Sequence, residues 1–194
     1  MITRDFDPLA DFHGLWTTEL AETYLPIPAA APGTSFECVD GYLIMSPSEG
    51  SRNSWAMLEL GSLLRGQARA AGHRVYGTLN VAFDRQTWIE PDLTVLRGPI
   101  KNEVWVRVEK VLVVGEFVSP SSKLRDRIDK PKMCAAAGVP FYLRVEVDDF
   151  DVHVELLQLH NGAYVSHAKA LGGMTFETDD PFPMSFDPAV LLES

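Results

Sequence analysis

The chain has 194 residues, of which 46% are hydrophobic and 23% charged, a composition typical of a folded domain with one substantial core. Its formal net charge of -10 excludes the uniformly basic surface found on many nucleic-acid-binding proteins. Residues 1–32 lack the basic start and apolar run of a signal peptide, and no stretch reaches the roughly 18 apolar residues of a membrane span, so we expect a cytoplasmic protein without membrane contact. Cys38 and Cys134 are too few for a zinc cluster and should be small buried side chains.

The first part of the chain predicts an extension followed by a hairpin. Pro26, Pro28, Pro32 and Gly33 indicate a loop after any helix near residues 15–24. We therefore expect residues 1–35 to be an N-terminal extension packing on the core, and residues 36–194 to form a single domain. Asp40-Gly41, between the apolar stretches 36–39 and 42–45, is a dipeptide that favours a two-residue hairpin turn.

The middle of the chain predicts one helix and three strands. Apolar residues recur at helical spacing over 55–71, and Gly72 ends that helix. Residues 74–83 and 88–96 read as two strands, and residues 110–118 as a strand buried on both faces. Glu116 interrupts this last strand, and a charged group there requires a cation, a metal ion or a hydrogen-bond donor.

The last third predicts a helix and a group of strands. The helix ends at Gly138, and Pro131 requires that it either begins near Asp129 or is distorted at the proline. Strands are expected over residues 140–147 and 150–159, with an edge strand over 163–170. The order of elements predicts an α/β fold with one mixed central sheet flanked by helices.

Three residues suggest a metal-dependent phosphodiesterase centre. Asp92 and Glu116 could face one another across neighbouring strands and hold a divalent cation, while Lys130 orients or activates water. Five basic residues, Lys123, Arg125, Arg127, Lys130 and Lys132, stand close to Glu116 with only Asp126 and Asp129 as acids, a local net charge of +3. This basic run is either a solvated surface or part of a substrate-binding site.

An ordered set of short motifs resembles the Uma-two family of endonucleases of the PD-(D/E)XK type. The motifs are Glu37-x-x-Asp40-Gly41, Met45-Ser46-Pro47, Pro91-Asp92, Glu116-x-x-Ser119-Pro120-Ser121, Asp126-x-x-x-Lys130 and Ala137-Gly138-Val139-Pro140-x-Tyr142. The resemblance covers residues 36–159 and implies a restriction-endonuclease-like fold. It also implies that Asp92 and Glu116 are the metal-binding carboxylates and that Lys130 is the lysine of the motif.

The chain departs from the family pattern at several positions. Val118 stands where the standard motif has its lysine, and Asn53 or Arg52 stands where many members have a histidine. Cys134 and Leu143 replace a frequent tyrosine and a frequent tryptophan.

The predicted function is hydrolysis of DNA phosphodiester bonds with Mg²⁺ or Mn²⁺ bound by Asp92 and Glu116. Lys132 competes with Lys130 for the catalytic role, since two positions along a helix differ by about 200°. Glu37 is either a third carboxylate of the site or a cross-strand salt-bridge partner. Residues expected near the substrate are Ser119, Ser121, Lys123, Arg125 and Lys132, and the two serines also cap the turn. A homodimer is expected, because two sites can cut two strands.

Other interpretations stay open from the sequence. Glu116 could form only a buried ion pair, with Arg125 or Lys130 as partner. The protein would then be a catalytically silent relative that uses the same sheet for binding or dimerisation. A further alternative is a phosphodiesterase that acts on RNA or on a small nucleotide.

Overall fold

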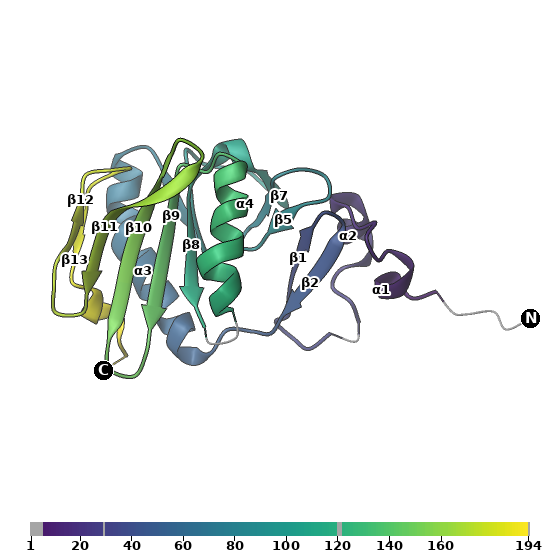
Figure 1. The fold of residues 1–194 in the computed structure, drawn as a ribbon, viewed down its shortest axis with the longest axis horizontal. Helices are drawn as coiled ribbons and strands as arrows, with labels where there is room; N and C mark the ends of the chain where they lie inside the picture. Colours follow the sequence, from purple (N-terminus) through teal and green to yellow (C-terminus); the bar gives the residue numbers. More distant parts are fainter. Residues whose placement is uncertain (1–5, 29, 120–121, 194) are drawn as a thin grey trace, which may run out of the picture. The chain divides into compact units, whose positions relative to one another are not determined.

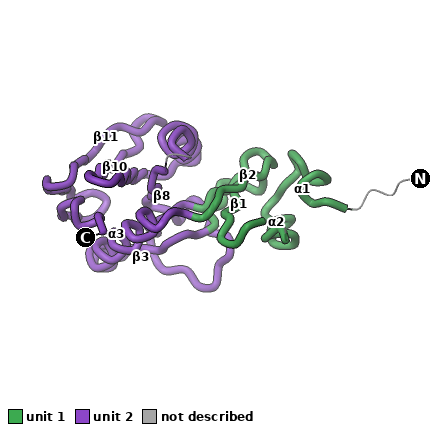
Figure 2. The backbone as a smooth tube through the Cα atoms, turned by 90° about the horizontal axis from the view of Figure 1, so that it is seen from below, with its two compact units in different colours: residues 1–48, 80–90 green, residues 49–79, 91–194 purple. Residues whose placement is uncertain are grey.

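The computed structural model describes residues 6–28, 30–119 and 122–193, and these form two compact units. Unit 1 comprises residues 1–48 and 80–90, and unit 2 comprises residues 49–79 and 91–194 (Figure 2). The N-terminal 35 residues thus share a unit with the hairpin and with a later segment of the chain. The expected domain boundary at residue 35 stays a prediction.

Unit 1 is built around antiparallel strands in the order β2, β1, β5 and β4. The turn between its first two strands has positive φ at both centres, 50° at Asp40 and 81° at Gly41, so the predicted hairpin is confirmed. Its elements are α1 (Pro8–Asp11), α2 (Thr18–Tyr24), β1 (Ser35–Val39), β2 (Tyr42–Ser46), β4 (Asn80–Ala82) and β5 (Trp88–Ile89).

Unit 2 contains a six-stranded sheet in the order β11, β10, β9, β8, β6 and β3 (Figure 1). Strands β8 and β9 are parallel and the other pairs are antiparallel, so the sheet is mixed, as expected. The helices of the unit are α3 (Ser51–Ala70), α4 (Lys130–Ala136), a π-helical turn (Arg125–Asp129) and 3₁₀ turns at Val108–Lys110 and Pro188–Leu191. Its strands are β3 (Arg74–Tyr76), β6 (Leu93–Leu96), β7 (Trp105–Arg107), β8 (Val111–Val118), β9 (Phe141–Val147), β10 (Val152–His160), β11 (Ala163–Leu171), β12 (Phe176–Thr178) and β13 (Met184–Phe186).

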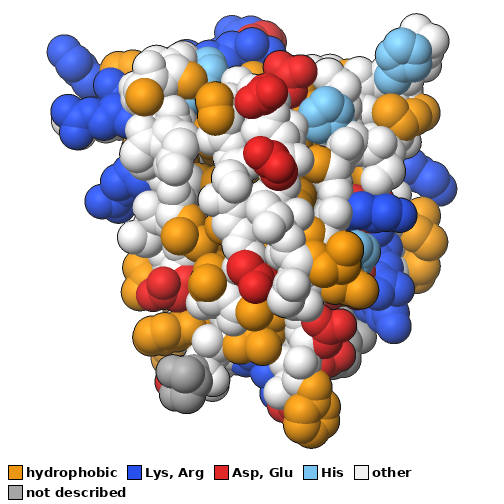
Figure 3. All heavy atoms as spheres, turned by 90° about the vertical axis from the view of Figure 1, so that its left-hand side faces the viewer, with side chains coloured by type: hydrophobic (Ala, Val, Ile, Leu, Met, Phe, Trp, Pro, Cys, Tyr) orange, Lys and Arg blue, Asp and Glu red, His pale blue; other side chains and the backbone are white. Residues whose placement is uncertain are grey.

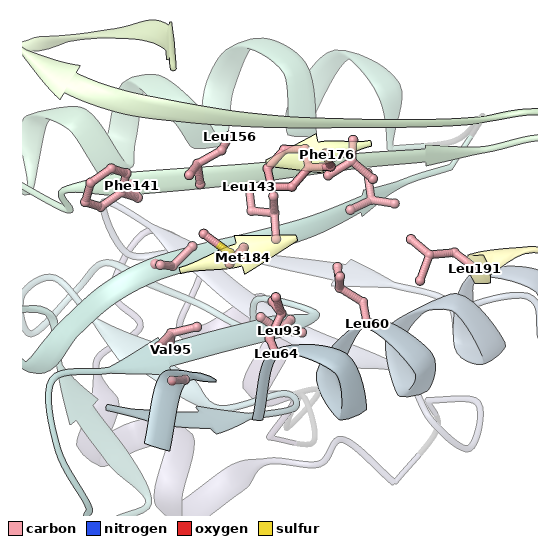
Figure 4. Close-up of a cluster of buried hydrophobic side chains, with 14 of the residues drawn as sticks. Leu60, Leu64, Leu93, Val95, Phe141, Leu143, Leu156, Phe176, Met184 and Leu191 are labelled. Carbon is pink, nitrogen blue, oxygen red and sulfur yellow. The ribbon is translucent and has the colours of Figure 1, made fainter. Parts of the chain in front are cut away.

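The apolar core of unit 2 lies between α3 and one face of this sheet. Leu60 and Leu64 of α3 point toward Leu93, Leu143 and other apolar side chains of the sheet (Figure 4). The hairpin β12–β13 extends the core with Phe176 and Met184 (Figure 4). Helix α4 covers part of the opposite face (Figure 1). Every residue of β8 is buried, as expected for a strand covered on both sides.

Two expected strands are each divided, and the sequence prediction was wrong on this point. Residues 74–83 form β3 and β4, and residues 88–96 form β5 and β6. The two halves of each segment join different sheets, which a straight strand cannot do. The breaks coincide with Gly77 and Pro91; proline has no N–H for a ladder bond.

Within the described residues, none of the helices has both the length and the hydrophobicity needed to cross a membrane.

Candidate active site

Four charged side chains of unit 2 meet at the face of the sheet opposite the apolar core. Asp92 directly precedes β6, Glu116 lies in β8, Asp126 in the π-helical turn, and Lys130 at the first residue of α4. We call these four residues the polar cluster. Sequence analysis expected three of them together, and it quoted Asp126 only as part of the family motif.

Lys130 contacts two carboxyl groups of the polar cluster, and Asp92 is held by the main chain. Lys130 Nζ donates a hydrogen bond of 2.7 Å to Glu116 Oε1 and lies 3.6 Å from Asp126 Oδ1. Asp92 Oδ2 accepts a hydrogen bond of 2.8 Å from the backbone N–H of Phe117. Exposure is 2% for Glu116, 3% for Asp126 and 6% for Lys130. The structure therefore brings Lys130 to Glu116, whereas Lys132 is exposed on another side of the helix.

Burial changes the protonation of the cluster. It raises the pKa of Asp92 to about 6, although the Phe117 N–H and the charge of Lys130 act in the opposite direction. Burial also raises the pKa of Glu116 well above its usual range. For Lys130, burial alone would lower the pKa, but Glu116 and Asp126 outweigh it and keep the amine protonated. The Lys130 amine contacts Glu116 and Asp126, and its charge also acts on Asp92. With all four groups ionised, the cluster has a net charge of -2 and favours a further cation.

Two more polar residues, which sequence analysis did not predict as site residues, adjoin the cluster: Asn53 of α3 and Glu49, which precedes this helix. Asn53 Nδ2 donates to Glu49 Oε2 at 2.9 Å and to the carbonyl oxygen of Phe117 at 3.2 Å. The negative charge of Glu49 contributes to the raised pKa of Asp92, which indicates that the two carboxylates are near one another. The sequence signals for this pair were their four-residue spacing and the place of Asn53 or Arg52 at the family's frequent histidine.

The remaining predicted site residues have contacts of other kinds. Glu37 belongs to unit 1, where it is buried and its Oε1 accepts a hydrogen bond of 2.8 Å from the N–H of Glu90. Ser119 and Ser122 hydrogen-bond reciprocally, which caps the turn after β8. Ser121 lies outside the described residues.

The basic run after Glu116 is not one continuous surface. Arg127 is ion-paired with Glu146 of β9, Arg125 is half-buried, and Lys130 belongs to the polar cluster. Lys123 and Ser119 line a cavity of about 510 Å³, and Lys132 lines a separate groove of about 470 Å³. The local charge of +3 therefore does not act as a single patch.

The surface at the β12–β13 end of the sheet is electrostatically mixed. Acidic side chains lie along the middle of this face, and basic ones lie mainly near its borders (Figure 3). The larger cavity is also mixed, because Glu146, Asp148 and Asp151 line it together with Lys123. Neither surface is a strongly positive binding site for a phosphate backbone.

The donor atoms of the polar cluster fit a hard divalent cation in kind but are few in number. Asp92 and Glu116 offer carboxylate oxygens, and Phe117 adds a main-chain carbonyl next to Glu116. In the part of the chain that the structure describes, no three Asp, Glu, His or Cys side chains are grouped as a complete metal site. A cation would therefore need water or substrate oxygens as its other ligands, which is usual for Mg²⁺.

Two of the comparisons with known proteins found a match. A protein-family model, Uma2, described as "Putative restriction endonuclease", matches residues 21–190. A solved structure of "a putative nuclease belonging to DUF820" from Anabaena variabilis ATCC 29413 is similar in fold, with a TM-score of 0.60 and 15% sequence identity. That likeness covers 88% of this chain and 95% of the other. The comparison with curated proteins found no match.

Proposed function

Because the chain belongs to the Uma2 family, described as "Putative restriction endonuclease", we propose that it is a metal-dependent nuclease that hydrolyses phosphodiester bonds of DNA. The observation that carries this proposal is the polar cluster, in which Lys130 is bonded to the buried Glu116 and Asp92 is bonded to the main chain of the next residue, Phe117. Burying two carboxyl groups around one amine, with a third carboxyl group whose pKa is raised by burial, costs stability, and a cluster of this kind is more typical of a functional site than of a structural one.

The residues that would hold the cation are Asp92 and Glu116, with the Phe117 carbonyl as a third oxygen. When bound, Mg²⁺ or Mn²⁺ would polarise the phosphate and lower the pKa of a bound water. Asn53 holds the carbonyl of Phe117 in place from α3, and the Phe117 N–H fixes one oxygen of Asp92. Main-chain and side-chain contacts on both sides thus orient the candidate ligands.

Lys130 would provide the positive charge that the reaction needs. Its amine is protonated, because Glu116 and Asp126 stabilise the charged form. An ammonium group has three donors, so one can remain on Glu116 while another orients water or binds the phosphate oxygens that gain charge in the transition state. Asp126 holds the other side of the amine and limits where it can point.

A second candidate function has a specific observation in its favour. The 2.7 Å bond between Lys130 and Glu116 satisfies the buried carboxylate without any metal, as expected for a silent scaffold. In that case the sheet would serve for binding or dimerisation. The two proposals differ in their response to cations: a nuclease site should gain thermal stability from millimolar Mn²⁺, and a silent ion pair should not.

The decisive experiment is nicking of supercoiled plasmid by the full chain with Mg²⁺, Mn²⁺ or EDTA. Asp92→Asn should reduce the rate by at least about 100-fold, since loss of a metal ligand removes several kcal/mol of transition-state stabilisation. Asp149→Asn is the matched control, because this carboxylate is exposed in the same unit. Equal rates for the two variants would reject the proposed site.

The substrate and the assembly are tested in the same preparation. Parallel reactions on a single-stranded RNA of similar length would detect the alternative that the enzyme acts on RNA, and sedimentation would measure whether the chain is a homodimer. Cleavage of RNA alone would be consistent with the proposed metal site but would reject DNA as the substrate.

A further inference from the structure

The helix that carries Lys130 contains a local irregularity just before this residue. Residues Arg125–Asp129 form a π-helical turn, and the N–H of Lys130 donates to the carbonyl of Arg125, five residues earlier. In a regular α-helix the same N–H would donate to the carbonyl of Asp126. Single π-turns inside α-helices are rare and occur frequently at functional sites.

Pro131 accounts for a gap in the hydrogen bonding of this turn. Proline has no N–H, so residue 131 cannot continue the pattern by donating to the carbonyl of Asp126. Because Lys130 donates to Arg125 instead, the Asp126 carbonyl needs a donor from outside the helix. A buried carbonyl without one would cost stability.

That donor is Tyr142 of β9. Its hydroxyl donates a hydrogen bond of 2.8 Å to the Asp126 carbonyl, and the whole side chain is buried. Strand β9 pairs in parallel with β8, and Tyr142 stands two residues before Arg144, the register partner of Glu116. One rigid side chain therefore connects the strand beside Glu116 to the turn that precedes Lys130.

We propose that Tyr142 is a positioning residue for Lys130: its hydroxyl replaces the helical donor that Pro131 lacks and fixes the π-turn that places the amine on Glu116. This inference rests on the proposed function only in giving Lys130 a role in catalysis. The geometry by itself makes a separate statement, that the position of the Lys130 amine depends on the Tyr142 hydroxyl. The hydrogen bond of Tyr142 is to the main chain of Asp126, so its effect on Lys130 passes through the turn.

The test removes one oxygen atom and measures the environment of Lys130 directly. Full-length wild type and Tyr142→Phe are treated with an acetylating N-hydroxysuccinimide ester, and acetylation of each lysine is followed by mass spectrometry. In Tyr142→Phe we expect Lys130 to be acetylated about fivefold faster relative to the exposed Lys169, because the hydrogen bond that closes the turn is lost. An unchanged ratio would overturn the proposal.

Tyr164→Phe is the matched control. The Tyr164 hydroxyl also donates a 2.8 Å hydrogen bond to a main-chain carbonyl, that of Val139, and its ring lies 5.7 Å from the ring of Tyr142. Its removal should leave the acetylation of Lys130 at the wild-type ratio. An equal increase in both variants would show general loosening of this face and would contradict a specific role for Tyr142.

A second comparison tests the same link through thermal stability, which can be measured even if Tyr142→Phe is destabilised. Pro131→Ala supplies an N–H at position 131, so Tyr142→Phe should lower the melting temperature less in the Pro131→Ala background than in the wild type. Equal decreases in both backgrounds would reject the link between the proline and the hydroxyl.

Nuclease assays on the same variants separate this proposal from the proposed function. If the wild type cleaves DNA, Tyr142→Phe should lower kcat and leave KM nearly unchanged, because substrate binding is retained while Lys130 is displaced. If the wild type does not cleave, the proposed function fails, and the acetylation ratio still decides whether Tyr142 positions Lys130.

Discussion

Glu116 and Phe117 are neighbours in β8, yet their side chains lie on opposite faces of the six-stranded sheet and meet different surroundings. Phe117 packs into the apolar core under α3, and Glu116 joins the polar cluster under the helix that begins at Lys130. Both side chains are almost fully buried. One face is stabilised by burial of apolar area, whereas the other contains charges whose burial is costly unless they are paired.

The two faces of this sheet place different demands on their side chains. The core face needs only shape and hydrophobicity, which many side chains can provide. The polar face depends on a balance of charge, so a change in one group alters the protonation of the others. The two faces should therefore respond differently to substitutions of similar size and to pH.

Replacement of Lys130, the positively charged residue of the polar cluster, should have the largest effect on stability. Lys130→Met keeps the length of the side chain but leaves Glu116 and Asp126 without their amine, and we expect a loss of about 3 to 5 kcal/mol in the free energy of unfolding at pH 8. Urea unfolding measures it, with the exposed Lys132→Met as control. Similar losses for the two variants would mean that the ion pair does not hold this face together.

A cavity in the apolar core should cost somewhat less and should be independent of pH. Leu60 is fully buried between α3 and the sheet, and Leu60→Ala should lower the free energy of unfolding by about 3 kcal/mol. The core cluster contains no ionising side chain, so the loss should be equal at pH 5 and pH 8. A loss that varied strongly between these pH values would show that the two faces are coupled.

Asp92→Asn should raise the free energy of unfolding at pH 8, in contrast to the two variants above. The pKa of Asp92 is about 6 in the folded protein against 3.8 as the ordinary value, so the native state binds the proton more tightly. Stability is therefore lost as pH rises from 3.8 to 6, and the variant should recover about 2 to 3 kcal/mol at pH 8 and almost nothing below pH 4. Its amide oxygen can still accept the Phe117 N–H.

Unfolding curves in EDTA at pH 4 and pH 8 test this prediction, since EDTA removes any bound cation that would stabilise the aspartate. A variant less stable than the wild type at pH 8 would show that Asp92 contributes more by its hydrogen bond than it costs by its charge.

The sequence predicted the parts of the fold that depend on local pattern. Asp40-Gly41 specified the hairpin, and the continuous apolar run around Glu116 specified a strand buried on both faces. The breaks at Gly77 and Pro91 were missed, because alternation of residue types does not reveal that a strand leaves one sheet for another. The pairing of β12 with β13 was missed for a similar reason, since short strands carry too few residues for a clear period.

The candidate site was predicted only where single residues stood out. Glu116 was conspicuous because it is a charge within an apolar strand, and Lys130 followed from the family motif. The choice between Lys130 and Lys132 required the π-turn, which shifts the direction of side chains and has no simple signal in sequence. Asn53 of α3 and Glu49 just before it approach the site from another part of the chain, so their sequence signals became meaningful only with the tertiary structure.

The smallest effect should come from an ion pair that resembles the one in the polar cluster in chemistry but not in burial. Arg52 at the start of α3 pairs with Asp149 in the turn between β9 and β10, and their side chains are 47% and 68% exposed. Water screens both charges before and after folding, so Asp149→Asn should change the free energy of unfolding by less than about 1 kcal/mol, and less still in 1 M salt. Lys130→Met should keep most of its effect in the same salt, because ions do not penetrate a buried pair. If salt weakened both effects equally, burial would not be the property that distinguishes the polar cluster, and the raised pKa values of Asp92 and Glu116 would need another cause.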